Sequence, residues 1–173
     1  MKSARTRVGV AAELKPLLSR EPRWTLAVAE SLTAGHVQAQ VSAISGASNY
    51  FLGGITAYSL DQKVKLLGVD RVSARRVNSV SGEVAEQMAR GVCRMFGSDF
   101  GVGTTGFAER SPDDDVEEPF AWWALARREV RGRFTFRRGR VECPGCSRVE
   151  TQQIVAEVVL TELVAWLREC RNE

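Results

Sequence analysis

The chain of 173 residues has the length of one domain, and 44% hydrophobic with 26% charged residues excludes a disordered protein. Its formal net charge of +3 is too small to indicate a polyanionic partner by itself. The basic residues 1–7 are not followed by a continuous apolar run, and no run approaches the roughly 18 apolar residues that span a membrane. We therefore predict one cytoplasmic domain, residues 1–173, with no membrane association and with reduced cysteines.

The first quarter of the chain alternates between helical and extended patterns. Residues 8–20 have apolar side chains at helical spacing, and Glu21-Pro22 ends this predicted helix. The apolar run at residues 24–29 predicts a buried strand, and residues 33–45 predict a second helix.

The second predicted strand covers residues 50–58, which are rich in β-branched and aromatic side chains. Its Gly53-Gly54 pair indicates a bulge or the close approach of another group. Residues 59–62 read S-L-D-Q, the form of a capping box, and predict a short helix that ends at Gly68.

Further along, Ser81-Gly82-Glu83 has the form of a helix start, with apolar residues at fourfold spacing after it. Residues 100–105 predict a third strand, and residues 109–118 form a polar loop.

The last third predicts a hairpin and a long helix. Residues 120–129 and 133–136 read as paired strands that turn at Arg131-Gly132, and residues 149–171 have apolar residues in helical register. The whole order predicts an α/β protein, a three-layer α/β/α sandwich with a mixed, mostly parallel sheet.

Ser31 lies where the first predicted strand gives way to a helix. Free backbone N–H groups and the positive end of the helix favour either an activated serine or a bound anion there. The alternative is that Ser31 or Thr33 only caps the helix.

Residues 29–35, A-E-S-L-T-A-G, resemble the A-E-S-C-T-G-G motif of the CinA C-terminal-domain family, the PncC-type nicotinamide-mononucleotide deamidases. The resemblance continues in order through residues 51–54, 58–59, 63, 66–69, 80–85 and 105–106. It covers residues 10–170, nearly the whole chain.

This resemblance implies an amidohydrolase that converts nicotinamide mononucleotide to nicotinate mononucleotide and ammonia, with an α/β/α fold, no metal and no cofactor. It implies Ser31 as nucleophile, with Tyr58 and Lys63 beside it. The expected partners are a small mononucleotide and further copies of the chain. To substrate binding we assign Glu30, Thr33, Gly35, Gly54, Thr104, Thr105, Gly106 and Arg148.

The residue types allow this chemistry. Lys63 falls in the first turn of a predicted helix, where the helix dipole and partial burial lower the pKa of an amine toward that of a general base. A solvated lysine is the alternative. Tyr58 either orients the proton or is an aromatic residue at the edge of the core. His36 has no evident carboxylate to orient it, so a serine–lysine pair fits better than a Ser-His-Asp triad.

The phosphate or ribose has several candidate ligands. Thr104, Thr105 and Gly106 end a strand, and either bind the substrate or form an ordinary turn. Arg148, at the start of the last helix, is the candidate phosphate ligand.

The chain departs from the family pattern at three places. Leu32 and Ala34 replace a cysteine and a glycine, and the methyl of Ala34 is expected to narrow the pocket. A glycine-rich loop becomes the acidic residues 109–118, which we expect to be solvated, mobile and directed away from the site; a Mg²⁺ site is the weaker alternative. Around Arg148 the match is offset. A catalytically inactive paralogue that binds a nucleotide or regulates is therefore the second hypothesis.

Two other patterns leave alternatives open. We expect Cys143-Pro144-Gly145-Cys146 to be a turn, with a zinc site or a redox pair as alternatives. The arginines of residues 127–140 indicate a charged face that protects edge strands, with nucleic-acid binding as the less favoured function. Alternation puts Phe134 and Phe136 inward, and Trp122-Trp123 is divided between the core and an oligomer contact.

Overall fold

The structure is a computed structural model and describes residues 9–172. Its centre is one five-stranded sheet in the order β2-β1-β3-β4-β5. The strands are β1 (Leu26–Glu30), β2 (Phe51–Thr56), β3 (Phe100–Phe107), β4 (Phe120–Arg128) and β5 (Phe134–Glu142). β1 pairs in parallel with β2 and β3, whereas β4 is antiparallel to β3 and β5. Four strands thus run one way and β4 runs against them, so the sheet is mixed as predicted.

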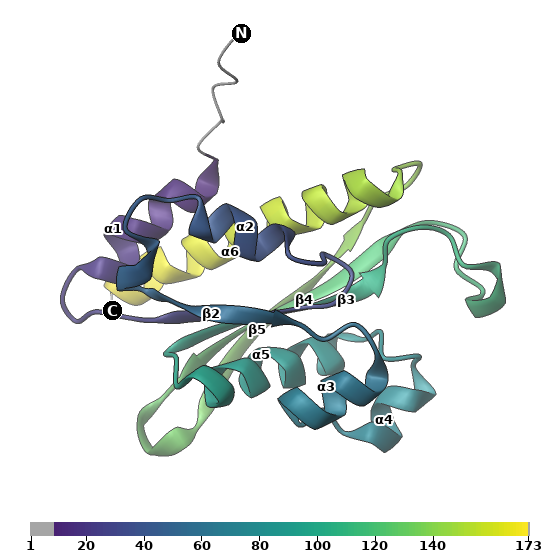
Figure 1. Ribbon diagram of the computed structural model, residues 1–173, viewed down its shortest axis with the longest axis horizontal. Helices are drawn as coiled ribbons and strands as arrows, with labels where there is room; N and C mark the ends of the chain where they lie inside the picture. The colour runs from purple at the N-terminus through teal and green to yellow at the C-terminus, as the bar shows by residue number, and fades with distance from the viewer. Residues whose placement is uncertain (1–8, 173) are drawn as a thin grey trace, which may run out of the picture.

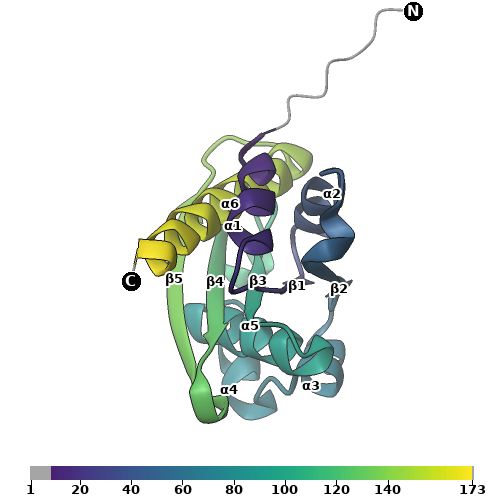
Figure 2. The same cartoon turned by 90° about the vertical axis from the view of Figure 1, so that its left-hand side faces the viewer.

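Helices cover both faces of the sheet (Figures 1 and 2). One face carries α1 (Leu14–Ser19), preceded by the 3-10 turn Val10–Glu13, together with α2 (His36–Ser42) and α6 (Arg148–Asn172). The other carries α3 (Leu60–Leu67), α4 (Arg71–Arg76) and α5 (Gly82–Phe96). The predicted three-layer sandwich is confirmed. No helix within residues 9–172 is long and apolar enough to cross a membrane.

Each helical layer buries its own apolar cluster against the sheet. The α6 side packs around Phe100, Leu125 and Leu160, and the α5 side around Met88. The approach of α5 to β3 requires glycine, because a Cβ on Gly103 would lie 2.3 Å from the Ala85 carbonyl oxygen.

Local signals account for most of the element boundaries. The Ser59 hydroxyl accepts from the Gln62 N–H at the start of α3, and the Ser81 hydroxyl accepts from the Val84 N–H at the start of α5. The register of β1 against β2 shifts between the pairs Leu26–Phe51 and Ala27–Gly53, and a Cβ on Gly53 would lie 2.8 Å from the Phe96 ring, so the glycine pair lies at an irregularity and at a close approach.

Three elements differ from the prediction. α2 begins at His36 instead of Thr33, since Ala34 and Gly35 have φ values of +48° and +103°, outside the helical region. The helix α4 was not predicted; the Asp70 side chain caps it by accepting from the Ser73 N–H at 2.7 Å. β5 extends to Glu142, because it pairs with β4 along its whole length; the guanidinium groups of Arg137 and Arg140 lie over the rings of Trp166 and Phe120.

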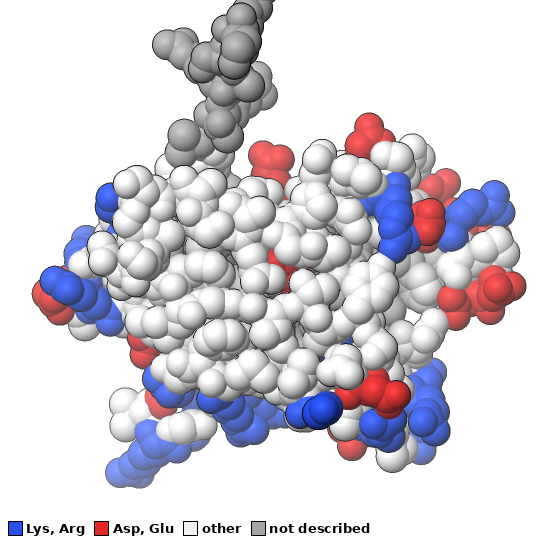
Figure 3. Space-filling view, in the orientation of Figure 1, with Lys and Arg blue, Asp and Glu red and all other residues white. Residues whose placement is uncertain are grey.

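The face over α2 and β2 carries almost no charge (Figure 3). Residues 31–60 contain no Asp, Glu, Lys or Arg, although a quarter of the whole chain is charged. β2 is also an edge of the sheet, so one side of its backbone has no neighbouring strand within residues 9–172.

Candidate functional site

A cavity of about 330 Å³ opens where β1 and β3 end. Crevices beyond the carboxyl ends of parallel strands are where α/β sheets bind ligands. The cavity brings together Ser31, Tyr58, Lys63, Thr105, Gly106 and Arg148 of the predicted site. It is also lined by residues that were not predicted: Leu32, Asn78, Val80, Phe107, Ala108, Glu109, Arg110 and Ser111.

Ser31 follows the last residue of β1 and is held by Glu30. The buried Glu30 carboxylate accepts the N–H groups of Gly35 at 3.0 Å, Val37 at 3.1 Å and Gln38 at 2.9 Å. These are free N–H groups at the start of α2, whose N-cap is a glycine without a side chain. The strand residue therefore caps the helix, and the intervening turn presents Ser31 to the cavity.

The interpretation of Ser31 or Thr33 as the cap was therefore wrong. The buried Thr33 hydroxyl instead pairs with the Thr104 hydroxyl at 2.7 Å, which joins the turn to β3. His36 is directed back to its own turn, with Nδ1 at 2.7 Å from the Thr33 carbonyl oxygen, and does not line the cavity.

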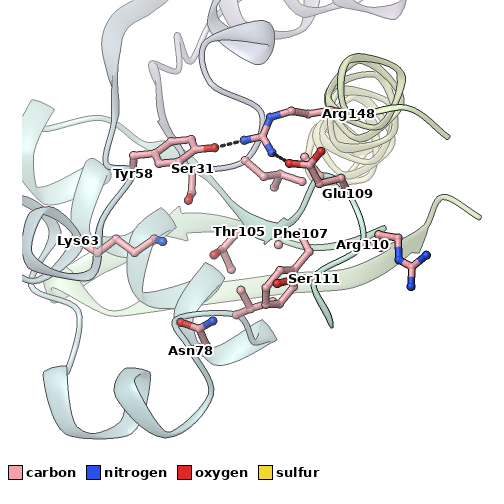
Figure 4. A pocket seen from close by; sticks show the side chains of 14 residues that line it. Ser31, Tyr58, Lys63, Asn78, Thr105, Phe107, Glu109, Arg110, Ser111 and Arg148 are labelled. Carbon is pink, nitrogen blue, oxygen red and sulfur yellow. Dashed lines mark hydrogen bonds and ion pairs between the residues drawn. The ribbon is translucent and has the colours of Figure 1, made fainter. Parts of the chain in front are cut away.

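Lys63 lies on α3 with its side chain only 4% exposed and its amine directed into the cavity (Figure 4). Desolvation by burial lowers its pKa to about 8. At pH 7 about a tenth of such amines are neutral, roughly 300 times more than at an ordinary lysine. Its amine forms no ion pair with any residue in the range 9–172, so no carboxylate there stabilises the charged form, and the neutral fraction can accept a proton.

Tyr58, Arg148 and Glu109 form a chain across the cavity (Figure 4). The guanidinium of Arg148 donates to the Tyr58 hydroxyl and to the Glu109 carboxylate. Arg148 is placed by a capping box at the start of α6, in which the Ser147 N–H donates to the Glu150 carboxylate at 2.9 Å and the Glu150 N–H to the Ser147 hydroxyl at 3.4 Å.

Hydrogen bonds also hold the sides of the cavity that β3 and the segment after α4 form. The Thr105 hydroxyl donates to the Ser79 carbonyl oxygen at 2.7 Å, which attaches β3 to the segment after α4. Asn78 and Ser79 both have positive φ, and the Asn78 amide donates to the Asp114 carboxylate at 2.7 Å.

The acidic loop is exposed, as predicted, but the prediction that it points away from the site is wrong for Glu109. Glu109 lines the cavity and binds Arg148, while Asp114 holds Asn78 on the other side. Between them, Ser111 and Val116 exchange backbone hydrogen bonds at 2.8 and 3.0 Å. Residues 107–111 therefore form one side of the cavity, and the carboxylates of Glu109 and Asp114 attach the loop to two other segments of the chain.

Several residues assigned to substrate binding lie outside the cavity lining. Glu30, Thr33, Gly35 and Thr104 build the turn beneath Ser31, as described above. A Cβ on Gly54 would lie 2.6 Å from the Val28 carbonyl oxygen, so this glycine allows the close packing of β2 against β1. Ala34 is exposed and does not narrow the cavity, contrary to expectation.

The position of Arg148 has a local signal in the sequence, whereas two of the cavity residues that were not predicted have none. The segment S-R-V-E at residues 147–150 has the form of a capping box and marks the start of α6. Asn78 and Glu109 had none, since only the fold brings them to the cavity.

The C-x-x-C segment and the arginine-rich hairpin make contacts within the chain. Cys143-Pro144-Gly145-Cys146 is a turn, with the Cys146 N–H donating to the Cys143 carbonyl oxygen at 3.1 Å and Gly145 at φ +71°. Phe134 and Phe136 pack inward against the α5 layer, as predicted. Arginines of the hairpin bind within the chain, as Arg137 does with Glu169 and Arg138 with Glu86.

Comparison with known proteins identifies the fold and the family. A family model described as the CinA C-terminal domain matches residues 9–167. A CinA-like protein from Chlorobium limicola is 38% identical over 146 residues, which are 84% of this chain and 34% of the relative. One from Picosynechococcus is 46% identical over 100 residues, which are 58% of this chain and 24% of the relative. The chain thus spans about a quarter to a third of the length of these curated relatives.

Solved structures share the whole fold. A competence-damaged protein (CinA) superfamily protein from Enterobacter cloacae aligns with a TM-score of 0.82 and 21% identity, over 96% of this chain and 95% of that one. The competence damage-inducible protein A from Klebsiella pneumoniae aligns with a TM-score of 0.80 and 22% identity, over 92% and 95%. The match along residues 9–167 and the shared architecture together show that this chain belongs to the CinA C-terminal domain family.

Proposed function

We propose that this chain is an amidohydrolase that deamidates nicotinamide mononucleotide to nicotinate mononucleotide and ammonia. The observation that carries the proposal is the pairing, in one cavity, of a serine at a strand end with a buried lysine whose pKa is lowered to about 8. A hydroxyl becomes a nucleophile when a neighbouring base takes its proton.

In this mechanism the neutral Lys63 amine accepts the Ser31 proton as Oγ attacks the carboxamide carbon. Backbone N–H groups that follow Ser31 donate to the developing oxyanion. The lysine then passes the proton to the leaving nitrogen, ammonia departs, and a serine ester remains. Water, deprotonated by the same amine, hydrolyses the ester and restores Ser31. Tyr58 and Arg148 border the same cavity and orient the substrate.

The test is ammonia release from nicotinamide mononucleotide, with nicotinate mononucleotide identified as the second product. Ser31→Ala is expected to lower kcat at least about 1,000-fold, because the nucleophile is gone, while circular dichroism remains that of the wild type. Unchanged turnover in Ser31→Ala, or no release from any nucleotide or nucleoside amide, would reject the proposal.

A binding module without turnover is the second candidate. Glu109, on the loop that departs from the family pattern, already occupies the guanidinium of Arg148. Thermal stabilisation by the mononucleotide without ammonia release supports this candidate, and turnover rejects it.

We also propose that copies of the chain associate through the uncharged face over α2 and β2. Leu52 is 43% exposed on the edge strand, and no like charges within residues 31–60 oppose the contact. Leu52→Lys is therefore expected to convert an oligomer to monomer in light scattering at about 50 μM protein. Val72→Lys is the control, since Val72 is 62% exposed on α4, in the other helical layer. A monomeric wild type, or an equal effect of both variants, contradicts the proposal.

A further inference from the structure

Arg148 is the arginine that points into the cavity, and a carboxylate of the same chain already binds it. Its guanidinium donates to the Glu109 carboxylate and to the Tyr58 hydroxyl (Figure 4). Arg110, also on the cavity lining, is directed outward, and its guanidinium lies 3.6 Å from the Glu117 carboxylate. Lys63 is buried on the other side, beside Ser31. A substrate anion that reaches Arg148 therefore meets a guanidinium that already has a partner.

The backbone on both sides of Glu109 is anchored, although its side chain is 61% exposed. Ala108, immediately before it, is buried in a cluster with Leu32 and Val155. Two residues after it, Ser111 pairs with Val116 across the base of the loop. The carboxylate is therefore presented to Arg148 by an anchored backbone, and displacing it requires turning the side chain away.

The charge of a substrate determines how well it binds beside the Glu109–Arg148 pair. One terminal nitrogen of Arg148 donates to Glu109 and the other to Tyr58, so a phosphate that needs the two-pronged guanidinium fork competes with both partners. A phosphate that did not displace Glu109 would lie beside a carboxylate, and like charges a few ångströms apart repel. An uncharged hydroxyl in the same place meets neither obstacle.

We propose that Glu109 is a specificity-determining residue that weakens the binding of phosphorylated amides relative to the same amides without phosphate. The inference rests on the proposed function, because it concerns the substrate of the same cavity. It deepens that function by assigning to one side chain the discrimination between a nucleotide amide and a nucleoside amide.

The experiment uses two substrates that differ only in the phosphate, nicotinamide mononucleotide and nicotinamide riboside. Glu109→Gln removes the charge and retains the size of the side chain. It is expected to raise the ratio of kcat/KM for the mononucleotide over the riboside by about tenfold or more, through a lower KM for the mononucleotide. Asp113→Asn is the matched control: it removes a carboxylate from the same loop, outside the cavity lining, and is expected to change the ratio less than twofold.

The same comparison is made by binding. In a Ser31→Ala background, calorimetry gives the Kd of each compound with and without Glu109→Gln, independently of turnover. A tighter mononucleotide with an unchanged riboside supports the inference even if the wild type hydrolyses neither, in which case only the proposed function fails. Turnover with a substrate ratio that Glu109→Gln leaves unchanged, or changes no more than Asp113→Asn does, overturns the inference and leaves the function intact.

Discussion

Lys63→Met is expected to unfold at higher urea concentration than the wild type at pH 7, although it is inactive. Burial lowers the pKa of Lys63 from 10.5 to about 8, which corresponds to a cost of about 3 kcal/mol for folding with the ammonium charged. Methionine has a similar length and no charge, so we expect a gain of about 1–3 kcal/mol in the free energy of unfolding. Activity should fall at least about 1,000-fold, because the base is gone.

The sign of the pH dependence follows from the two pKa values. Between pH 8 and 10.5 the unfolded chain holds a proton on Lys63 that the folded chain has released, so stability rises with pH in that window. The advantage of Lys63→Met is therefore largest below pH 8 and disappears near pH 10.5. Burial raises the pKa of Cys93 to about 11, which lowers stability above pH 9 in both proteins and cancels in their difference.

Unfolding is followed by the fluorescence of the four tryptophans. Lys65→Met is the control, since Lys65 is exposed on the same helix, and its stability and activity should match the wild type. The wild-type kcat/KM should rise with pH to a plateau, with a midpoint near 8. A destabilised Lys63→Met, or a rate independent of pH between 6 and 9, contradicts the assignment of Lys63.

Glu30→Ala is expected to lower the free energy of unfolding by about 3–5 kcal/mol. The substitution leaves the N–H groups of Gly35, Val37 and Gln38 without their acceptor, and it opens a cavity at a fully buried position. Glu30→Gln retains the volume and one acceptor oxygen, so about half of that loss is expected.

Glu118→Ala is the control for Glu30→Ala. The exposed Glu118 carboxylate also accepts a backbone N–H, from Gly145 at 2.9 Å, and water replaces it on removal. We expect a loss of less than about 1 kcal/mol. Amide hydrogen exchange at Val37 and Gln38 provides a local measure: it should accelerate in Glu30→Ala and remain unchanged in Glu118→Ala. Equal stability losses in the two variants would mean that Glu30 does not hold the turn below Ser31.

The fold was predictable where local chemistry determines it. The hydroxyls of Ser59 and Ser81 start α3 and α5 as their capping patterns indicated, and the apolar run before Ser31 forms β1. These signals depend on neighbours within four residues in the chain, so they can be identified without the tertiary structure.

Elements that depend on distant partners were not predictable. The strand residue Glu30 replaces the expected hydroxyl cap of α2, because its carboxylate reaches the N–H groups of a turn several residues away. The sequence predicts Glu109 as part of a solvated loop. In the structure it binds Arg148, which lies 39 residues further along the chain. The serine and the lysine of the candidate site were predicted together only through the family resemblance, and the structure brings both to one cavity.

The layer that contains α1 and α6 has a consequence for synthesis on the ribosome. Arg171, in the last turn of α6, donates to the carbonyl oxygens of Leu17 at 2.9 Å and Pro22 at 2.9 Å, and its guanidinium lies over the Trp24 ring. Leu14 and Leu18 of α1 share the apolar cluster that α6 covers. Until α6 has been synthesised, a nascent chain therefore displays this uncovered apolar surface, to which chaperones that recognise such surfaces can bind.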